Sequence, residues 1–169
     1  TLKDEVTLVV MLPFEEVSYW DEIKQICNWA RTHVTSTFYI CWGAQAALYN
    51  FYGINKYPLD KKLFGIFNHK INDPSFPLFR GFDDEFKAPH SRHTTILAEE
   101  INQHPELTIL SESDEAGVYI VSSRGGREFY VTGHSEYSPY TLHNEYLRDM
   151  EKGMNSVNPP VNYYKNNDS

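Results

Sequence analysis

Apolar positions along the chain change from a helical spacing to an extended spacing and back again, which is the pattern of an α/β protein. In residues 14–31 the apolar side chains recur three or four positions apart, so a helix is predicted there, opened by Pro13. Cys27 falls on the apolar side of this helix. We therefore expect Cys27 to lie in the hydrophobic core.

The next stretch predicts a strand, a tight turn and a second helix around a single cysteine. Residues 36–40 are rich in β-branched and aromatic side chains, whereas the helix formers Ala, Gln and Leu follow Cys41, and Gly53 ends the helix. A cysteine in such a turn projects beside the free amides of the helix, whose partial positive charge favours a thiolate. This is the geometry of a nucleophile elbow, in which the amides after Cys41 also face an oxyanion.

The rest of the pattern continues the α/β arrangement. Gly and Pro residues separate the periodic segments, and the two extended runs on either side of residues 124–127 predict a β-hairpin. The predicted strands are residues 6–12, 63–67, 107–110, 117–121 and 128–132, and the predicted loops are residues 80–86 and 88–93. Further helices are predicted at residues 98–103 and 138–150. The tail from residue 155 is expected to lie on the surface.

Composition narrows the class of protein. The chain of 169 residues is long enough for one domain with a proper core, and its hydrophobic content of 41% argues against disorder. A net charge of −8 argues against a nucleic-acid partner or an anionic membrane surface. Cys27 and Cys41 lie in different contexts, which argues against a disulfide framework. There is no apolar run of membrane-spanning length and no visible signal peptide, so the cytoplasm is expected, although a chain that begins at Thr1 could have lost a leader.

Candidate partners for the cysteine follow from what thiol catalysis needs, namely a base and a group that orients the base. His134 follows a predicted strand, at the edge where open α/β sheets carry reacting groups, and Glu136 lies two residues later. The residues alone leave simpler roles open, with Cys41 as a core cysteine and His134 as a structural histidine beside a solvated glutamate. His90 and His93 also suggest a metal site, but no third ligand has a suitable spacing.

A family resemblance sharpens this hypothesis. Residues 39–46, Tyr-Ile-Cys-Trp-Gly-Ala-Gln-Ala, resemble the nucleophile segment of the homoserine O-acyltransferases of the trans-succinylase family, and similarity extends over residues 13–168. The resemblance implies an α/β fold of the amidotransferase-like (flavodoxin-like) kind, with a mostly parallel sheet flanked by helices. It also implies a catalytic triad of Cys41, His134 and Glu136, and no metal. Tyr39 replaces the family's His, which can alter the pocket beside the cysteine, and Ser135 replaces a Pro.

The same resemblance implies three substrate-binding residues. Lys62 matches the family's substrate-binding lysine, Ser91 matches a residue that lines the amino-acid pocket, and Arg148 matches the arginine that grips the substrate carboxylate. From the residues alone, each has a simpler interpretation. They are a solvated loop lysine, a turn serine, and a helix arginine paired with a neighbouring glutamate.

The N-terminal end departs from the family. The Thr-Gly-Ala-Pro loop that usually precedes Pro-Phe-Glu-Glu-Val, and that supplies oxyanion amides and influences acyl-donor choice, is absent before Pro13. Either the chain is divergent there, or residues 1–12 are not contiguous with residue 13 in the native protein. Because the family is longer at its N-terminus, we favour the second interpretation, in which residues 1–169 form a single acyltransferase domain that lacks N-terminal segments of the full family length.

The predicted function is acyl transfer from acyl-CoA to the hydroxyl of L-homoserine through a thioester on Cys41, in methionine biosynthesis. Acetyl is preferred over succinyl, acyl-CoA is a co-substrate, no other cofactor is expected, and the family implies a homodimer. Three alternatives stay open. They are O-acetylation of another amino-acid hydroxyl such as that of L-serine, an amidotransferase-type cysteine hydrolase, and a non-catalytic binding domain with a retained core cysteine.

Overall fold

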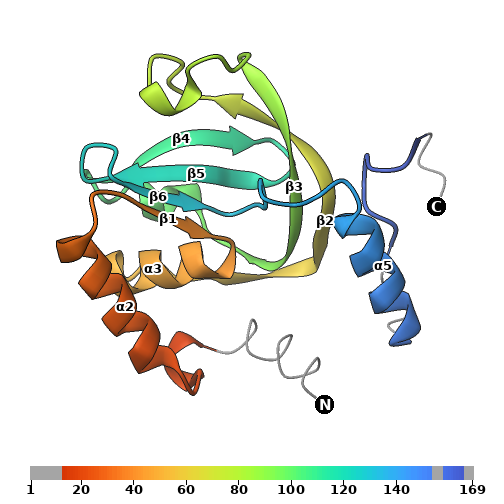
Figure 1. Ribbon diagram of the computed structural model, residues 1–169, viewed down its shortest axis with the longest axis horizontal. Coiled ribbons are helices and arrows are strands. Elements are labelled where there is room, and N and C mark those ends of the chain that lie inside the picture. The colour runs from red at the N-terminus through yellow and green to blue at the C-terminus, as the bar shows by residue number, and fades with distance from the viewer. Residues whose placement is uncertain (1–12, 154–157, 166–169) are drawn as a thin grey trace.

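The computed structural model describes residues 13–153 and 158–165. Its centre is a six-stranded sheet with helices packed against it (Figure 1). The predicted strand at residues 6–12 lies outside the described residues. In the described ranges, no helix is long and apolar enough to cross a membrane.

The sheet is mixed. Its strands lie in the order β1-β6-β5-β4-β2-β3, and only β1 and β6 pair in parallel, whereas the other four pairings within the described residues are antiparallel. The α/β prediction is confirmed, but the expected mostly parallel sheet is not what these residues form, because short turns join β4 to β5 and β5 to β6. The strands are β1 (Thr37–Ile40), β2 (Tyr57–Ile71), β3 (Glu85–Thr95), β4 (Thr108–Ser113), β5 (Gly117–Ser123) and β6 (Glu128–Val131).

Two helices cover one face of the sheet, and a third lies to one side of it. Figure 1 shows α2 and α3 against the sheet beneath β1 and β6, and α5 standing apart beside β2. The predicted helix at residues 14–31 is divided in two, because Val17 adopts an extended backbone that turns the chain before Trp20. The helical elements are η1 (Phe14–Glu16), α2 (Trp20–His33), α3 (Trp42–Tyr52), η2 (Pro77–Phe79), α4 (Ala98–Ile101) and α5 (Thr141–Glu151).

The hydrophobic core lies on both faces of the sheet. On one face, Cys27 of α2 and Leu48 of α3 pack against Val121 and Tyr130, so the core position predicted for Cys27 is confirmed. On the other face, Phe79 and Phe129 belong to a second apolar cluster. The two clusters hold β5 and β6 between them, which fixes the strand end that precedes His134.

The segment predicted as a loop at residues 88–93 is instead the middle of β3. It pairs with β2 in antiparallel register, so that Gly65 faces His90 and Phe64 faces Ser91. Alternate residues of β3 are buried, including His90, Arg92 and Thr94. The predicted hairpin of β5 and β6 is confirmed, with Ile120 opposite Val131.

Candidate active site

Cys41 lies between β1 and α3 in a strained turn. Its backbone angles are φ 51° and ψ −117°, and a positive φ is unusual for a residue other than glycine. The Cys41 amide donates to Val131 O at 2.7 Å, and the Cys41 carbonyl accepts from Ala44 and Gln45. These bonds attach the cysteine to β6 on one side and to the first turn of α3 on the other, as the elbow prediction requires.

The first turn of α3 supplies amides for an oxyanion. Trp42 and Gly43 are its first two residues, and such amides have no acceptor within their own helix. Gly43 has nothing within 4 Å of the position that a Cβ would occupy, so space is open beside its backbone. Any carbonyl attacked by Cys41 would place its developing negative charge near these amides.

His134 reaches Cys41 because β6 runs parallel to β1. Ile40 is paired with Val131, so the chains leave the sheet side by side. The His134 amide donates to Pro89 O at 2.9 Å, which anchors the loop. Gly133 is also required there, because a Cβ would come within 2.7 Å of the Tyr119 ring and 2.9 Å of Pro89 O.

His134 is joined to both predicted partners. Its Nδ1 lies 2.7 Å from Glu136 Oε1, and Cys41 is close enough to influence the pKa of His134. Burial lowers the pKa of His134, but the hydrogen bond and charge of Cys41, followed by those of Glu136, outweigh burial and raise that pKa to about 9. With this pKa, His134 is an imidazolium at neutral pH.

A buried cation lies within electrostatic reach of Cys41. Arg92 is 4% exposed, and its guanidinium donates to Thr94 O at 2.7 Å and to Ala116 O. Burial lowers the pKa of Arg92 to about 10, while the charge of Cys41 raises it, so the two groups are within electrostatic reach. Arg92 was not among the residues predicted for the site, although it lies between Ser91 and His93.

The two histidines considered for a metal site do not face each other. His90 is fully buried and contacts His69, with 3.0 Å between their Nε2 atoms, whereas His93 is half-buried three residues along the same strand. Residues an odd number of positions apart on a strand point to opposite faces. In the described residues, no three His, Cys, Asp or Glu side chains form a group able to hold a metal.

A cluster of polar side chains, which we propose below as the amino-acid pocket, joins β2, β3 and α5. Ser91 Oγ donates to Glu145 Oε2 at 2.5 Å, and Lys62 Nζ lies 3.7 Å from Glu145 and 2.9 Å from Asp149. Ser91 and Lys62, which come from different strands, therefore meet at one helix. Arg148 is more exposed, at 44% of its side chain, and reaches the pair through Asp149 at 2.8 Å.

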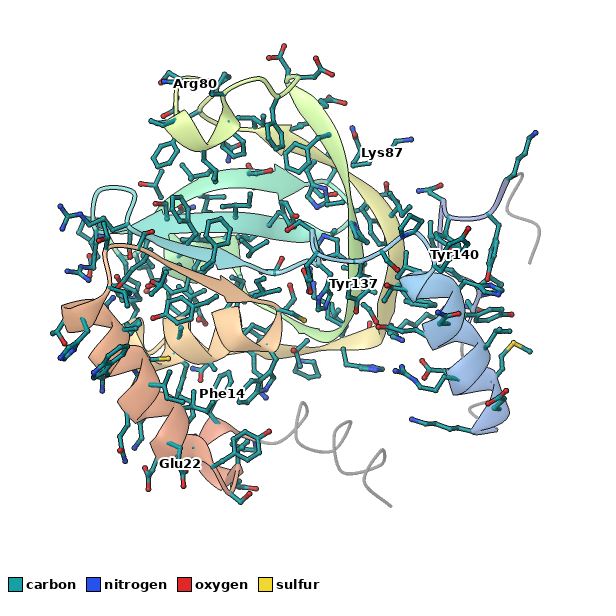
Figure 2. The ribbon with its side chains drawn as sticks, in the orientation of Figure 1. Phe14, Glu22, Arg80, Lys87, Tyr137 and Tyr140 are labelled. Carbon is teal, nitrogen blue, oxygen red and sulfur yellow. The ribbon has the colours of Figure 1, made fainter. Side chains whose placement is uncertain are left out.

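Tyr137 connects His134 with the polar cluster on α5. Its ring stacks on His134 with the centroids 4.3 Å apart, and its hydroxyl donates to Glu145 Oε1 at 2.7 Å. Figure 2 shows Tyr137 between the strand ends and α5. Tyr137 thus links His134, the neighbour of Cys41, to Glu145. Glu145 and Asp149 were not predicted as site residues, because only the fold brings α5 to Lys62 and Ser91.

Comparisons with known proteins agree with this geometry. A model of the family described as homoserine O-succinyltransferase matches residues 7–169. The chain belongs to the homoserine O-succinyltransferase family. Relatives named homoserine O-acetyltransferase from Parabacteroides distasonis and Bacteroides fragilis are 65% and 64% identical over 160 residues, which is 95% of this chain and 51% and 52% of theirs. The chain therefore spans about half the length of the curated relatives it matches.

Solved structures support the fold assignment of this family member. A glutamine amidotransferase from Thermotoga maritima has a TM-score of 0.68 at 14% identity, over 86% of this chain and 60% of its own. Another from Methylobacillus flagellatus has a TM-score of 0.66 at 11% identity, over 88% of this chain and 56% of its own. At such identities the likeness concerns the fold, and it confirms the amidotransferase-like prediction.

The two departures from the family pattern have different surroundings. Tyr39 stacks on Tyr130 at 5.4 Å and meets Phe51 edge to face, so its ring belongs to the core beneath α3. Ser135 is exposed, and it counteracts in part the rise that burial causes in the pKa of Tyr119, so the two side chains are neighbours. A proline, which has no hydroxyl, could not influence Tyr119 in this way.

Proposed function

We propose that the protein transfers an acyl group from acyl-CoA to the hydroxyl of L-homoserine, through a thioester on Cys41, as a step in methionine biosynthesis. The observation that carries the proposal is the continuous path from Cys41 through His134 and Tyr137 to the Glu145 pocket. A nucleophile beside a pocket with both charges suits a zwitterionic amino acid as the acceptor.

The first half-reaction forms the acyl-enzyme. The Cys41 thiolate attacks the thioester carbonyl carbon, and the oxyanion of the tetrahedral intermediate faces the Trp42 and Gly43 amides. When the intermediate collapses, its bond to the CoA sulfur breaks. The leaving sulfur takes the proton of the His134 imidazolium, so His134 becomes neutral while Cys41 holds the acyl group.

The second half-reaction transfers the acyl group. Neutral His134 removes the proton of the homoserine hydroxyl as its oxygen attacks the Cys41 thioester. Collapse of the second tetrahedral intermediate breaks the carbon–sulfur bond, which releases O-acyl-L-homoserine and restores the thiolate and the imidazolium. Glu136, which bonds His134 Nδ1, holds the ring in one orientation through both steps.

The charged side chains of the pocket have complementary roles in acceptor binding. Arg148 offers a planar fork to the substrate carboxylate, and Lys62 adds a second positive charge. Glu145 is 15% exposed and is the carboxylate nearest to Tyr137, so we assign it to the substrate ammonium. Ser91, which donates to Glu145, orients that carboxylate.

The acyl group that we propose is acetyl, in agreement with the name of the relatives at up to 65% identity. We also propose a cytoplasmic homodimer that uses acyl-CoA as a co-substrate and needs no other cofactor, as the family resemblance implies. The Tyr39 substitution was one reason to consider L-serine as the acceptor. Because the Tyr39 ring packs against the core, this substitution gives L-serine little support.

An assay that crosses two donors with three acceptors tests the proposal. Acetyl-CoA and succinyl-CoA are each incubated with L-homoserine, L-serine or L-glutamine and the protein expressed from its complete gene, and free CoA is measured. We expect CoA release with acetyl-CoA and homoserine. Ammonia from glutamine without acyl-CoA would instead identify a hydrolase, and no CoA release with either hydroxy amino acid would refute acyl transfer.

A further inference from the structure

Helix α5, which carries Glu145 and Asp149, has little apolar anchoring of its own. Leu142 and Asp149 are the buried residues of its eleven, so one apolar side chain fixes it to the body. Leu147 and Met150 are 44% and 53% exposed. Most helices are positioned by a buried apolar face, so other contacts must fix the place of α5.

The C-terminal segment 158–165 is attached to β2 by its backbone. Val161 N donates to Phe64 O at 2.9 Å, and Ile66 N donates to Val161 O at 2.8 Å, which forms a parallel bridge. Asn162 Nδ2 adds a bond to Ile66 O at 3.1 Å. Three hydrogen bonds therefore tie this segment to β2 two to four residues beyond Lys62.

Gly65 makes this close approach possible. Its φ is +142°, and a Cβ at this position would lie 2.3 Å from Val161 O and 2.4 Å from Val161 N. Any side chain there would displace the backbone of the C-terminal segment, since neither main chain has room to yield. A glycine inside a strand often marks such a backbone contact.

The same segment also holds the first half of α5. Tyr164 OH lies 2.7 Å from His143 Nδ1, and its ring meets the rings of His143 and Tyr146 at steep angles. Tyr163 OH donates to Pro139 O at 2.5 Å, just before α5 begins. The described C-terminal residues lie on the same side of the molecule as α5 (Figure 1).

We propose that residues 158–165 are a strap that positions α5, and thereby Glu145 and Asp149, against Lys62 and Ser91, with Gly65, Val161 and Tyr164 as its positioning residues. The strap joins the strand that carries Lys62 to the helix that carries the two carboxylates. Its release moves the amino-acid pocket while Cys41 and His134 stay in place. This inference rests on the proposed function, because it assigns the pocket to the acyl acceptor.

Two variants release the strap at its two ends. Gly65→Ala inserts a Cβ into the Val161 backbone, and Gly81→Ala is the matched control, because Gly81 also has a positive φ of 88° but nothing within 4 Å. Tyr164→Phe removes the hydroxyl that meets His143, and Tyr140→Phe is its control, because Tyr140 is 71% exposed. The phenylalanine variant removes a single atom, so it tests the strap even if Gly65→Ala fails to fold.

The half-reactions are measured separately in the protein expressed from its complete gene. We expect Gly65→Ala to raise the Michaelis constant for homoserine roughly tenfold, since small misplacements of binding groups have effects of this order. Burst release of CoA in the absence of homoserine should stay within about twofold, because acylation does not use the pocket. Tyr164→Phe should also raise the Michaelis constant for homoserine without changing the CoA burst, but by a smaller factor. Hydrogen exchange of the Ile66 and Val161 amides should become faster in Gly65→Ala.

The outcomes separate the two hypotheses. No CoA burst from the unaltered protein refutes the proposed function itself. The strap is refuted if every variant shows the burst and the homoserine Michaelis constants of Gly65→Ala and Tyr164→Phe equal those of their controls. A parallel loss of burst and acceptor binding also refutes it, because the segment would then act on the whole fold.

Discussion

The two ends of the site are held in place by different forces. Around Cys41, the elbow continues into α3, whose Ala44, Ala47 and Leu48 have no exposed surface and pack on both α2 and the sheet. Around Glu145, the pocket depends on Leu142, on charged contacts from Lys62, and on hydrogen bonds from neighbouring elements.

The two proposed half-reactions should therefore respond differently to amino-acid substitutions. If Cys41 is the nucleophile, as we propose, its turn tolerates the loss of single polar contacts, because close packing keeps the turn in place. A pocket built from polar contacts loses geometry with each one. Acylation of Cys41 should therefore be the robust half-reaction, and acyl transfer to the amino acid the sensitive one.

Replacing the nucleophile should have the largest effect. Cys41→Ser removes the thiolate, so acyl-CoA alone should no longer add an acyl mass to the protein, and turnover should fall on the order of 10⁴-fold or more. Cys27→Ser is the matched control, because Cys27 is buried in the core, 4% exposed. Intact-protein mass spectrometry after acetyl-CoA treatment distinguishes the two variants. An acylated Cys41→Ser and an unlabelled Cys27→Ser would reverse the assignment.

Helices α3 and α5 should differ in how much the loss of a leucine side chain destabilises the fold. Leu48→Ala removes a fully buried side chain beneath the elbow and should lower the free energy of unfolding by about 2–5 kcal/mol. Leu147→Ala makes the same chemical change on α5, where the side chain is 44% exposed, and should change that free energy by less than about 0.5 kcal/mol. Urea denaturation of both variants provides the measurement. Equal losses would mean that α5 is anchored in the core as firmly as α3.

The elbow was predictable because its signals are local. A β-rich run, Cys41, helix formers and Gly53 follow one another, and the structure has β1, the turn and α3 in that order, with Gly53 in the left-handed conformation at the helix end. His134 could be predicted beside Cys41 from the strand that precedes it. Glu145 could not, because its relation to Ser91 depends on how α5 crosses β3.

Strand β3 escaped prediction for a different reason. Its buried face carries His90, Arg92 and Thr94, so a search for alternating apolar residues sees a polar loop. These side chains are satisfied by distant partners, such as Gln45 for Thr94 and Ala116 O for Arg92. Such pairings come from the tertiary fold. Gly65 within β2 is a local feature consistent with the close approach of another backbone, here that of Val161.

The polar pocket should respond most to the shape of its cation. Arg148→Lys keeps the charge but loses the bidentate fork, so the Michaelis constant for homoserine should rise severalfold, about 3- to 10-fold, while that for acyl-CoA stays nearly unchanged. Initial rates with each substrate varied in turn give both constants. Equal changes for the two substrates would mean that Arg148 serves only the Asp149 contact seen in the structure.

The smallest expected effect concerns the charge behind His134. The pKa of His134 is about 9 in the folded protein, above the ordinary value of 6.5, because the interactions with Cys41 and then with Glu136 outweigh burial. Its protonation therefore adds stability that is fully present below pH 6.5 and is lost as the pH rises through 9. Glu136 is 49% exposed and screened by water, so Glu136→Gln should cost at most about 1 kcal/mol at neutral pH, and the difference should vanish above pH 9.

Titration of the imidazole tests the order of these contributions. Because the interactions with Cys41 raise the pKa of His134 more than those with Glu136 do, this pKa, measured by NMR, should fall in Glu136→Gln and fall further in Cys41→Ser. The burst of CoA release should slow less in Glu136→Gln than in His134→Asn, since the glutamate orients the ring and the ring carries the proton. If Glu136→Gln lowers the pKa of His134 more than Cys41→Ser does, Glu136 and not Cys41 is the principal partner of the imidazolium. The pair of Cys41 and His134 would then not set the protonation of His134.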